Sequence, residues 1–389
     1  MLVLITTSFL DIIFNILFFI QYIFCQTPSL THQEINDLKI NQLQVIGSHN
    51  SYRLAMDDNV FKWLSRIDSS LAAELDYSHL PLDQQFSQAG IRQIELDVYY
   101  DPDGGLFNHR LGNIVTEDPI KPNFPELIEP GLKVLHFPDI DFQTNYLTFK
   151  DALLEVKKWS QNNPNHVPIF ILIEAKDEGV FDKHSLLSIL GFIRPLEFSL
   201  DALNTIDDEI REVFGADLNN VITPDNIRGN NPSLEEVVLN DGWPSLGESR
   251  GKVMFGLDNQ GRVMNDYIEG HPSLKGRIMF VEASPGTPEA AFLGMNTPSP
   301  DITKRVFQGY LVRTRADSDT KSARNGNTSR RDKALNSGAH FISTDYYSPD
   351  PRHEFQKAWT NYSVRLPGNI IARVNPVTGP THFINLEIE

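Results

Sequence analysis

Short apolar segments recur along the chain and alternate with longer segments of helical periodicity. The run 167–173 (VPIFILI) is continuously apolar, which is typical of strands buried on both faces of a parallel sheet. The apolar segments predict eight strands, at or within residues 43–47, 90–103, 132–135, 167–173, 252–257, 277–281, 310–314 and 339–344. Helices are expected between most of them, at residues 81–89, 148–160, 183–193, 201–213 and 233–240. Because parallel strands need crossover connections, this alternation predicts an α/β fold, a single-domain TIM-type (β/α)₈ barrel.

One predicted strand carries two acidic residues on the same face. The stretch 90–103 (GIRQIELDVYYDPD) alternates apolar and polar positions. Residues two apart on a strand point to one face, so Glu95 and Asp97 project together. Two such carboxylates repel each other unless a cation or a proton lies between them. We therefore expect this strand to border a binding site.

Polar side chains gather where the other predicted strands end. These residues are His49, Asn50, Glu95, Asp97, His136, Glu174, Asp258, Glu282, Arg313, Arg315 and Asp345. In a (β/α)₈ barrel, catalytic groups collect at the C-terminal ends of the strands. Charges spread over a surface would not follow strand ends so regularly, so we predict one site at this rim.

Four of these residues are hard oxygen donors: Asn50, Glu95, Asp97 and Glu174. Ca²⁺ takes six to eight oxygen ligands in irregular geometry, whereas zinc prefers nitrogen and sulfur. The set predicts a Ca²⁺ site, with Mg²⁺ as the weaker choice. Each residue also has an ordinary alternative, since Asn50 suits a turn and Glu174 can pair with Lys176.

The remaining rim residues suggest acid–base chemistry on a phosphate. His49 and His136 are the acid–base candidates, because imidazole titrates near neutral pH, and His109 is a third. Arg313 and Arg315 share a strand face, and guanidinium groups bind phosphate bidentately. Two lysines, Lys176 and Lys252, are candidates for added positive charge. Together they predict metal-assisted cleavage of a phosphodiester.

Charge and the N-terminal composition limit the partners and the location. The chain has 389 residues and a formal net charge of −17, which argues against nucleic acid and against a polybasic hold on lipid. Residues 1–26 are nearly all apolar and contain no Lys or Arg, so we expect a secretory signal peptide and an extracellular protein. A retained signal anchor is the alternative. The only cysteine, Cys25, lies at that boundary, so the mature chain would have no disulfide.

Six segments, taken in order, resemble one known family. They are IGSHNSY (46–52), IRQIELDVY (91–99), VLHFPDIDFQT (134–144), IFILIEAKD (169–177), GYLVRTRADSDT (309–320) and SGAHFISTDYY (337–347). This ordered set is similar to the calcium-dependent phosphatidylinositol-specific phospholipase C family, in its single-domain secreted microbial form. The resemblance implies a TIM-type barrel over residues 31–365, with 366–389 as a C-terminal tail packed on it.

The resemblance also implies roles for the rim residues. His49 and His136 would be the catalytic histidines, and Glu95 could share the base role. Asn50, Glu95, Asp97 and Glu174 would hold Ca²⁺. The inositol 2-hydroxyl would attack the phosphorus and expel diacylglycerol. His136 would protonate the leaving group or stabilise the phosphorane, and His49 would do the complementary task.

The implied substrate is a phospholipid headgroup at a membrane surface, with no obligate protein partner. Contacts to the headgroup are expected from Lys176, Lys252, Arg313, Arg315 and Tyr346. Two other readings remain open. A glycerophosphodiester phosphodiesterase has a similar barrel but usually carries His-Arg where this chain has His49-Asn50. An inactive secreted barrel that only binds is the second alternative.

Overall fold

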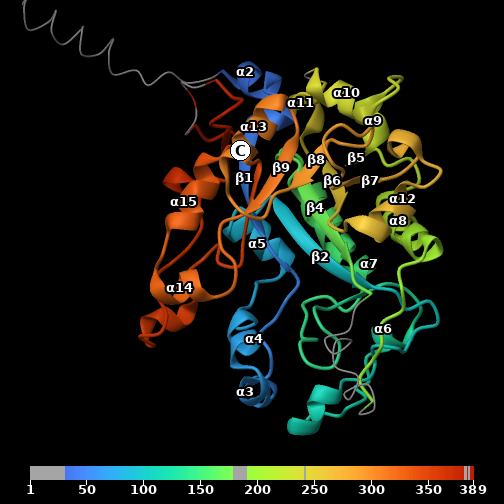
Figure 1. The fold of residues 1–389 in the computed structure, drawn as a ribbon, viewed down its shortest axis with the longest axis vertical. Coiled ribbons are helices and arrows are strands. Elements are labelled where there is room, and N and C mark those ends of the chain that lie inside the picture. The colour runs from blue at the N-terminus through green and yellow to red at the C-terminus, as the bar shows by residue number, and fades with distance from the viewer. Residues whose placement is uncertain (1–30, 178–190, 241, 381–382, 384–385) are drawn as a thin grey trace, which may run out of the picture.

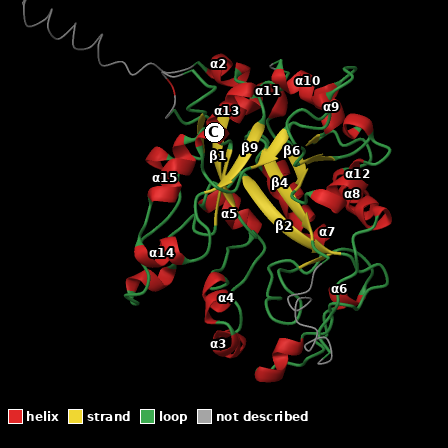
Figure 2. Cartoon of the chain, in the orientation of Figure 1, coloured by secondary structure: helices red, strands yellow, loops and turns green. Residues whose placement is uncertain are grey.

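Parallel strands form a curled sheet at the centre of the protein, and helices pack around it (Figure 1; Figure 2). The computed structural model describes residues 31–177, 191–240, 242–380, 383 and 386–389. The strands are β1 (Leu43–Ser48), β2 (Gln93–Tyr99), β3 (Lys133–Val134), β4 (Ile169–Ala175), β5 (Val221–Ile222), β6 (Val253–Leu257), β7 (Met279–Val281), β8 (Phe292–Gly294), β9 (Leu311–Arg315), β10 (Phe341–Thr344) and β11 (Ala372–Val374).

The α-helices precede the first strand or lie between later strands, and most of them cover the outside of the sheet. They are α2 (His32–Asp37), α3 (Asp58–Ile67), α4 (Ser69–Glu74), α5 (Leu82–Gln88), α6 (Pro125–Ile128), α7 (Phe149–Asn162), α8 (Leu200–Phe214), α9 (Pro224–Arg228), α10 (Leu234–Leu239), α11 (Leu246–Ser249), α12 (Gly261–Ile268), α13 (Pro300–Gln308), α14 (Lys321–Asn325) and α15 (Ser329–Asn336). Single 3₁₀ turns are η1 (Ile40–Gln42), η2 (Leu111–Val115), η4 (Pro272–Leu274), η5 (Pro351–Glu354) and η6 (Pro367–Asn369).

Eight parallel strands curl in the order β7-β6-β4-β2-β1-β10-β9-β8. Among the described residues, β7 and β8 contact each other without a hydrogen-bonded ladder, so the sheet is open at that seam. Strand β5 pairs with the start of β6, and β7 pairs with the rest of the same strand. The curled sheet confirms the predicted TIM-type α/β fold, with one edge-to-edge contact left unpaired.

Two strand assignments differ from the prediction. The segment 132–135 does not enter the barrel, because β3 is two residues long and pairs antiparallel to the end of β2 (Val98↔Val134). The eighth barrel strand is β8, which the sequence analysis missed. Three residues between proline- and glycine-containing loops are too few to show a strand periodicity.

The buried strands and the α7 stripe make up most of the core. In β4 only Glu174 is less than fully buried, which explains its continuous apolar run. Helix α7 begins after Thr148, whose side chain accepts a hydrogen bond from the Asp151 N–H. It buries Phe149, Leu153 and Val156 against the sheet, each contributing roughly 1.5–3 kcal/mol. The predicted helices at 81–89, 148–160, 201–213 and 233–240 are thus confirmed as α5, α7, α8 and α10, while 183–193 lies mostly outside the described residues.

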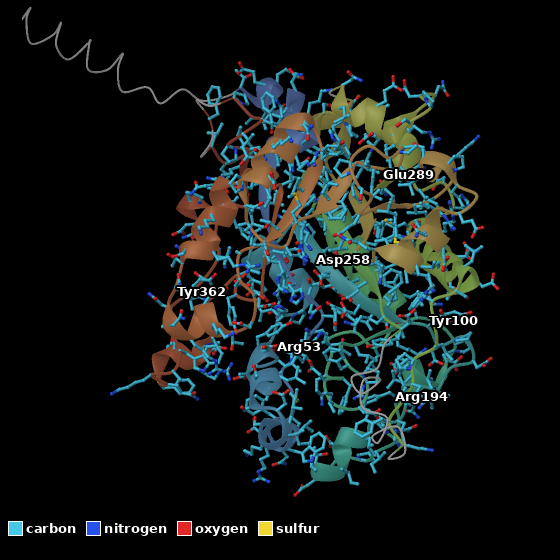
Figure 3. The ribbon with its side chains drawn as sticks, viewed as in Figure 1. Arg53, Tyr100, Arg194, Asp258, Glu289 and Tyr362 are labelled. Carbon is cyan, nitrogen blue, oxygen red and sulfur yellow. The ribbon has the colours of Figure 1, made fainter. Side chains whose placement is uncertain are left out.

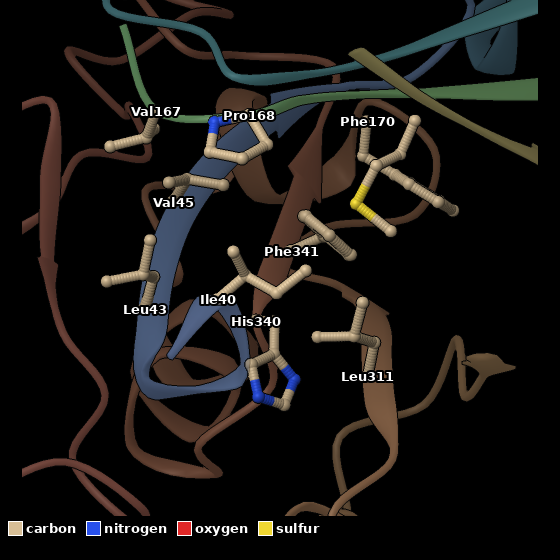
Figure 4. A pocket seen from close by; sticks show the side chains of 10 residues that line it. Ile40, Leu43, Val45, Val167, Pro168, Phe170, Leu311, His340 and Phe341 are labelled. Carbon is tan, nitrogen blue, oxygen red and sulfur yellow. The ribbon is translucent and has the colours of Figure 1, made fainter. Parts of the chain in front are cut away.

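The N-terminal end of the barrel is closed by packed apolar side chains. The rings of Phe170 and Phe341 stack with centroids 4.6 Å apart, and Phe292 lies 4.8 Å from Phe170. A cavity of about 20 Å³ remains beneath them, lined by aliphatic residues and His340 (Figure 4). Its size suits one water molecule.

Long connections extend from the other end of the barrel. Figure 1 shows α3, α4 and α6 beyond the C-terminal ends of β1 and β2.

Near the C-terminus of the chain, β11 pairs antiparallel with β1. The predicted boundary between a barrel at 31–365 and a tail at 366–389 stays a prediction, and the predicted signal segment 1–26 lies outside the described residues. In the part of the chain that is described, no helix is long and apolar enough to cross a membrane.

Candidate active site

His49 follows β1 directly and is held by residues from β9 and β10. The β1–β10 register pairs Ser48 with Thr344, so His49 and Asp345 leave the sheet side by side. His49 Nδ1 lies 2.7 Å from Asp345 Oδ1. On the other side of the ring, Nε2 lies 3.1 Å from an Arg315 nitrogen and 3.5 Å from Glu95 Oε1.

These contacts fix the tautomer of His49. Arg315 can only donate, so Nε2 accepts its hydrogen bond and Nδ1–H donates to Asp345. Burial, and then the positive charge of Arg315, lower the pKa of His49 to about 3 despite the nearby carboxylate. His49 is therefore a neutral imidazole near neutral pH, and its Nε2 lone pair faces Arg315, with Glu95 at the edge of the same nitrogen.

His136 is held in a second histidine–aspartate pair. Its Nδ1 lies 2.8 Å from Asp141 Oδ2, and Nε2 has no hydrogen-bond partner among the described residues. Asp141 is fully buried and also accepts two hydrogen bonds from Arg53, at 2.8 and 2.9 Å. Burial lowers the pKa of His136 to about 4, against the opposing effect of Asp141. Figure 3 shows Arg53 at this end of the barrel.

Three carboxylates meet beside His49. Glu95 and Asp97 come from β2 and Glu174 from β4, and each offers an oxygen within 4.8 Å of the others. The β2–β4 register places Asp97 directly opposite Glu174. Lys176 Nζ lies 3.3 Å from Asp97 and 3.4 Å from Glu174. The prediction that these strands bring their acidic residues to one rim is therefore met by the geometry.

The donor chemistry of this cluster suits a hard divalent cation. Asp97 is fully buried, and apart from the Lys176 ammonium 3.3 Å from Oδ2, neither of its oxygens has a hydrogen-bond partner among the described residues. Asn50 is also buried, in a left-handed conformation (φ 46°), and its amide nitrogen donates to Tyr77. This leaves its Oδ1 without a partner in the described structure. Three carboxylates and an unpaired amide oxygen are the ligands that Ca²⁺ prefers.

The electrostatics of the cluster support the same interpretation. Burial raises the pKa of Asp97 to about 7, against the lowering effect of Lys176. Burial also raises the pKa of Glu95 well above its usual range, with Arg313 opposing and Asp258 adding to the shift. Burial and mutual repulsion destabilise the ionised forms of these carboxylates, and a cation between them would stabilise those forms.

Most of the predicted headgroup residues lie at the rim or beside it. Arg313 forms an ion pair with Glu95, and Arg315 one of 2.7 Å with Asp345, so both lie at the rim. Lys176 lies there too. The Tyr346 hydroxyl has no partner in the described structure, and Tyr346 lines a groove of about 670 Å³ that also includes Asp345.

Lys252 is not brought to the site. It precedes β6, whereas the site lies where the strands end, so Lys252 belongs to the opposite end of the barrel. The prediction that Lys252 contacts the headgroup was wrong. A residue's position before or after a strand, rather than its charge, decides which end of the barrel its side chain reaches. His109 pairs instead with Asp139, at 3.5 Å, in the loop after β2.

The sequence analysis missed two supporting residues, Arg53 and Asp141. Both lie inside matched segments or directly after them, in HNSYR and HFPDID. An aspartate five residues after a strand-end histidine is a usable signal only if the chain is known to turn back there. The chain turns back between Phe137 and Asp141, which form an antiparallel bridge. No local sequence pattern predicted this turn.

Comparisons with known proteins agree with this geometry. The family described as "Phosphoinositide phospholipase C, Ca²⁺-dependent" matches residues 38–376. No curated protein sequence matches the chain. Among solved structures, a calcium-dependent phosphoinositol-specific phospholipase C from Pseudomonas sp. has 16% identity and a TM-score of 0.49, covering 88% of this chain and 97% of its own.

Two further solved structures have a lower TM-score. The Ca²⁺-dependent phosphatidylinositol-specific enzyme from Streptomyces antibioticus has 17% identity and a TM-score of 0.47, covering 83% of this chain and 99% of its own. A phosphatidylinositol-specific phospholipase C from Listeria monocytogenes has 12% identity and a TM-score of 0.41, covering 79% of this chain and 89% of its own. The assignment rests on the family match, because structural likenesses this weak do not establish a function.

Proposed function

Because this chain belongs to the Ca²⁺-dependent phosphoinositide phospholipase C family, we propose that it cleaves phosphatidylinositol to diacylglycerol and a cyclic inositol phosphate. The inositol 2-hydroxyl attacks the phosphorus, a new P–O bond closes the ring, and the bond to the glycerol oxygen breaks. One proton leaves the 2-hydroxyl and one is returned to the glycerol oxygen, so the reaction consumes no water.

The observation that carries this proposal is the convergence of His49 on the carboxylate cluster. His49 Nε2 lies 3.5 Å from Glu95 Oε1, so a proton acceptor borders the predicted cation ligands. A module that only binds would need the oxygen ligands but not two imidazoles, each oriented by its own aspartate. The pairs His49–Asp345 and His136–Asp141 have the arrangement of a base and its orienting carboxylate.

The two histidines supply the proton transfers in this proposal. His49 Nε2 accepts the 2-hydroxyl proton, and Asp345 stabilises the resulting imidazolium through Nδ1–H. In its protonated form His136 donates its Nε2 proton to the leaving glycerol oxygen, while Asp141 accepts from Nδ1–H and stabilises that imidazolium. Glu95 shares the base role through its contact with His49.

Asn50, Glu95, Asp97 and Glu174 would hold the calcium ion that the family requires. When bound, Ca²⁺ neutralises phosphoryl charge and lowers the pKa of a coordinated hydroxyl. Arg313 and Arg315 add positive charge on the β9 side of the rim, and Tyr346, whose hydroxyl is buried, lines the adjacent groove. These residues orient a phospholipid headgroup presented at a membrane surface.

A substrate comparison tests this function. Purified protein is given phosphatidylinositol in mixed micelles or water-soluble glycerophosphoinositol, each with calcium or with a chelator. We expect release of diacylglycerol and cyclic inositol phosphate only with calcium. Cleavage of the soluble diester alone would instead indicate a glycerophosphodiester phosphodiesterase.

Secretion is a separate proposal, supported by the apolar composition of residues 1–26. Expression of the full chain in a eukaryotic host should release a protein into the medium that lacks this segment. N-terminal sequencing of the released protein checks it, and retention of the intact chain in membranes would contradict it.

A further inference from the structure

A second buried carboxylate lies behind the pair formed by His49 and Asp345. Asp317 follows shortly after the end of β9 and is fully buried. The Ala316 N–H donates to the Ser343 carbonyl at 2.9 Å, so the pairing of β9 with β10 continues past the end of β9. This pairing brings the Asp317 side chain against the residues at the end of β10.

Three donors converge on the Asp317 carboxylate. Its Oδ1 accepts from the Asp345 N–H at 3.0 Å. Its Oδ2 accepts from the Thr344 hydroxyl and, at 3.2 Å, from the Tyr362 hydroxyl (Figure 3). The Thr344 hydroxyl oxygen accepts in turn from the Tyr346 N–H at 2.8 Å. One side chain therefore holds the backbone at the point where the chain leaves β10.

Packing alone does not account for an aspartate at this position. Within the described residues, no lysine or arginine forms an ion pair with Asp317, and the nearby Arg315 pairs with Asp345 instead. Burial, and then the charge of Asp345, raise the pKa of Asp317 to about 6, so it is ionised at neutral pH and accepts from all three donors. An apolar side chain would fill the space without the cost of burying a second carboxylate beside Asp345.

We infer that Asp317 is a positioning residue, which holds Asp345 in place and through Asp345 fixes the orientation of His49. Its effect on catalysis rests on the proposed function. Both oxygens of Asp345 are in use, one on His49 Nδ1 and the other on Arg315, each at 2.7 Å. Arg315 also donates to His49 Nε2 at 3.1 Å. A displacement of Asp345 would therefore disturb the contacts on both sides of the His49 ring.

Asp317 itself stays out of contact with the reacting groups. Within the described structure, none of its hydrogen bonds involves His49 or a predicted calcium ligand. Loss of Asp317 should leave the calcium ligands and the headgroup contacts in place while His49 loses its fixed orientation. The effect should thus fall on kcat, because a misplacement of about 1 Å can cost about 100-fold in rate.

The variant Asp317→Ala removes the acceptor of all three hydrogen bonds. With saturating calcium, we expect kcat on phosphatidylinositol to fall by about 100-fold and KM to change by less than about threefold. A retained rise in melting temperature with calcium shows that the variant is folded, and Asp317→Ser replaces it if this rise is absent. Asp317→Asn still offers one oxygen to the Asp345 N–H, so it should recover at least about tenfold of the loss. Asp208→Ala, on the exposed face of α8, should match the wild type.

A double-mutant cycle separates positioning from a general structural role. If Asp317 acts through Asp345, adding Asp317→Ala to Asp345→Ala should reduce kcat by less than about threefold further, because the side chain that Asp317 positions is already gone. Losses that multiply in the double variant would overturn the inference.

A spectroscopic readout is independent of lipid cleavage. The His49 Nδ1–H, bonded to a buried carboxylate, should give a downfield proton resonance that is protected from exchange and is assigned by its loss in His49→Gln. It should persist in Asp208→Ala and broaden or vanish in Asp317→Ala. An unchanged resonance in folded Asp317→Ala would overturn the inference and leave the proposed function intact. A wild-type protein that shows the resonance but does not cleave phosphatidylinositol would overturn the proposed function instead.

Discussion

His136 and Arg53 share one carboxylate oxygen: His136 Nδ1 and Arg53 Nε each lie 2.8 Å from Asp141 Oδ2. Arg53 is fully buried, and its charge is balanced by Asp141. Burial alone would raise the pKa of Asp141, but Arg53 and His136 outweigh it and hold this pKa below its usual range. One aspartate therefore both orients a catalytic candidate and compensates a buried charge.

Replacing Asp141 should damage stability and activity together. Asp141→Asn leaves Arg53 as an uncompensated buried charge, so the free energy of unfolding should fall by about 3–5 kcal/mol. The rate should fall as well, because an amide carries no charge to stabilise the protonated His136 that acts as the acid. Urea unfolding and lipid hydrolysis measure the two effects. His136→Gln, which leaves the Arg53 pair intact, should lose activity with a much smaller loss of stability.

The two histidines should respond differently to the leaving group. If His136 protonates the leaving oxygen, His136→Ala should lose far less activity on an inositol phosphodiester with a nitrophenol leaving group than on the lipid, because a good leaving group needs little protonation. His49→Ala should lose activity on both, since the attacking hydroxyl is the same. The measurement is kcat/KM for each variant on each substrate. Equal losses for His136→Ala on both substrates would refute its assignment as the acid.

Calcium should stabilise the fold through the predicted ligands. A ligand that binds only the folded state adds about 2.7 kcal/mol at a concentration of 100 times its Kd. We therefore expect millimolar calcium to raise the melting temperature, and Asp97→Asn to reduce or remove the shift. Glu236→Gln, on the exposed face of α10, serves as the charge-matched control and should keep the full shift. An unchanged shift in Asp97→Asn would exclude Asp97 as a ligand.

A buried aspartate far from the rim should make stability depend on pH. Burial raises the pKa of Asp207 to about 6, although Tyr267 donates to it at 2.7 Å and Arg277 lies 3.4 Å away. The folded state therefore holds this proton more tightly than the unfolded state does. The stabilisation is fully present below about pH 4 and is lost as the pH rises through about 6.

The comparison of Asp207→Asn with the wild type isolates this group. Between pH 4 and pH 7, the free energy of unfolding of the wild type should fall relative to the variant by about 2–3 kcal/mol. Asp208→Asn changes the exposed neighbour on α8 and should follow the wild-type pH dependence. Parallel curves for the wild type and Asp207→Asn would show that the carboxyl is not perturbed.

The sequence pattern predicted the TIM-type fold but not every strand of it. It also brought His49, Glu95, Asp97, Glu174, Arg313 and Arg315 to one rim, because a parallel sheet aligns the ends of its strands, and their roles stay predictions. It did not find β8, whose three residues are placed by pairing with β9 rather than by their own periodicity. The segment at 132–135 looked like a barrel strand because apolar runs do not encode the direction of pairing.

Supporting residues were harder to predict than the residues they support. Asp141 reaches His136 through a local reversal of the chain, and Arg53 reaches Asp141 across 88 residues. Lys252 shows the opposite error, since a basic residue was assigned by charge although it precedes its strand. For Arg53 and Asp141 the missing information was the path of the backbone beyond the strand end.

The space left by Gly294 has a consequence for how this protein can change over generations. Glu282, directly after β7, occupies space beside a residue that has no side chain, so any larger residue at position 294 would displace this carboxylate. A single nucleotide change in this codon would therefore rearrange the β7 side of the rim in descendants of this protein, while His49, directly after β1, would keep its contact with Asp345.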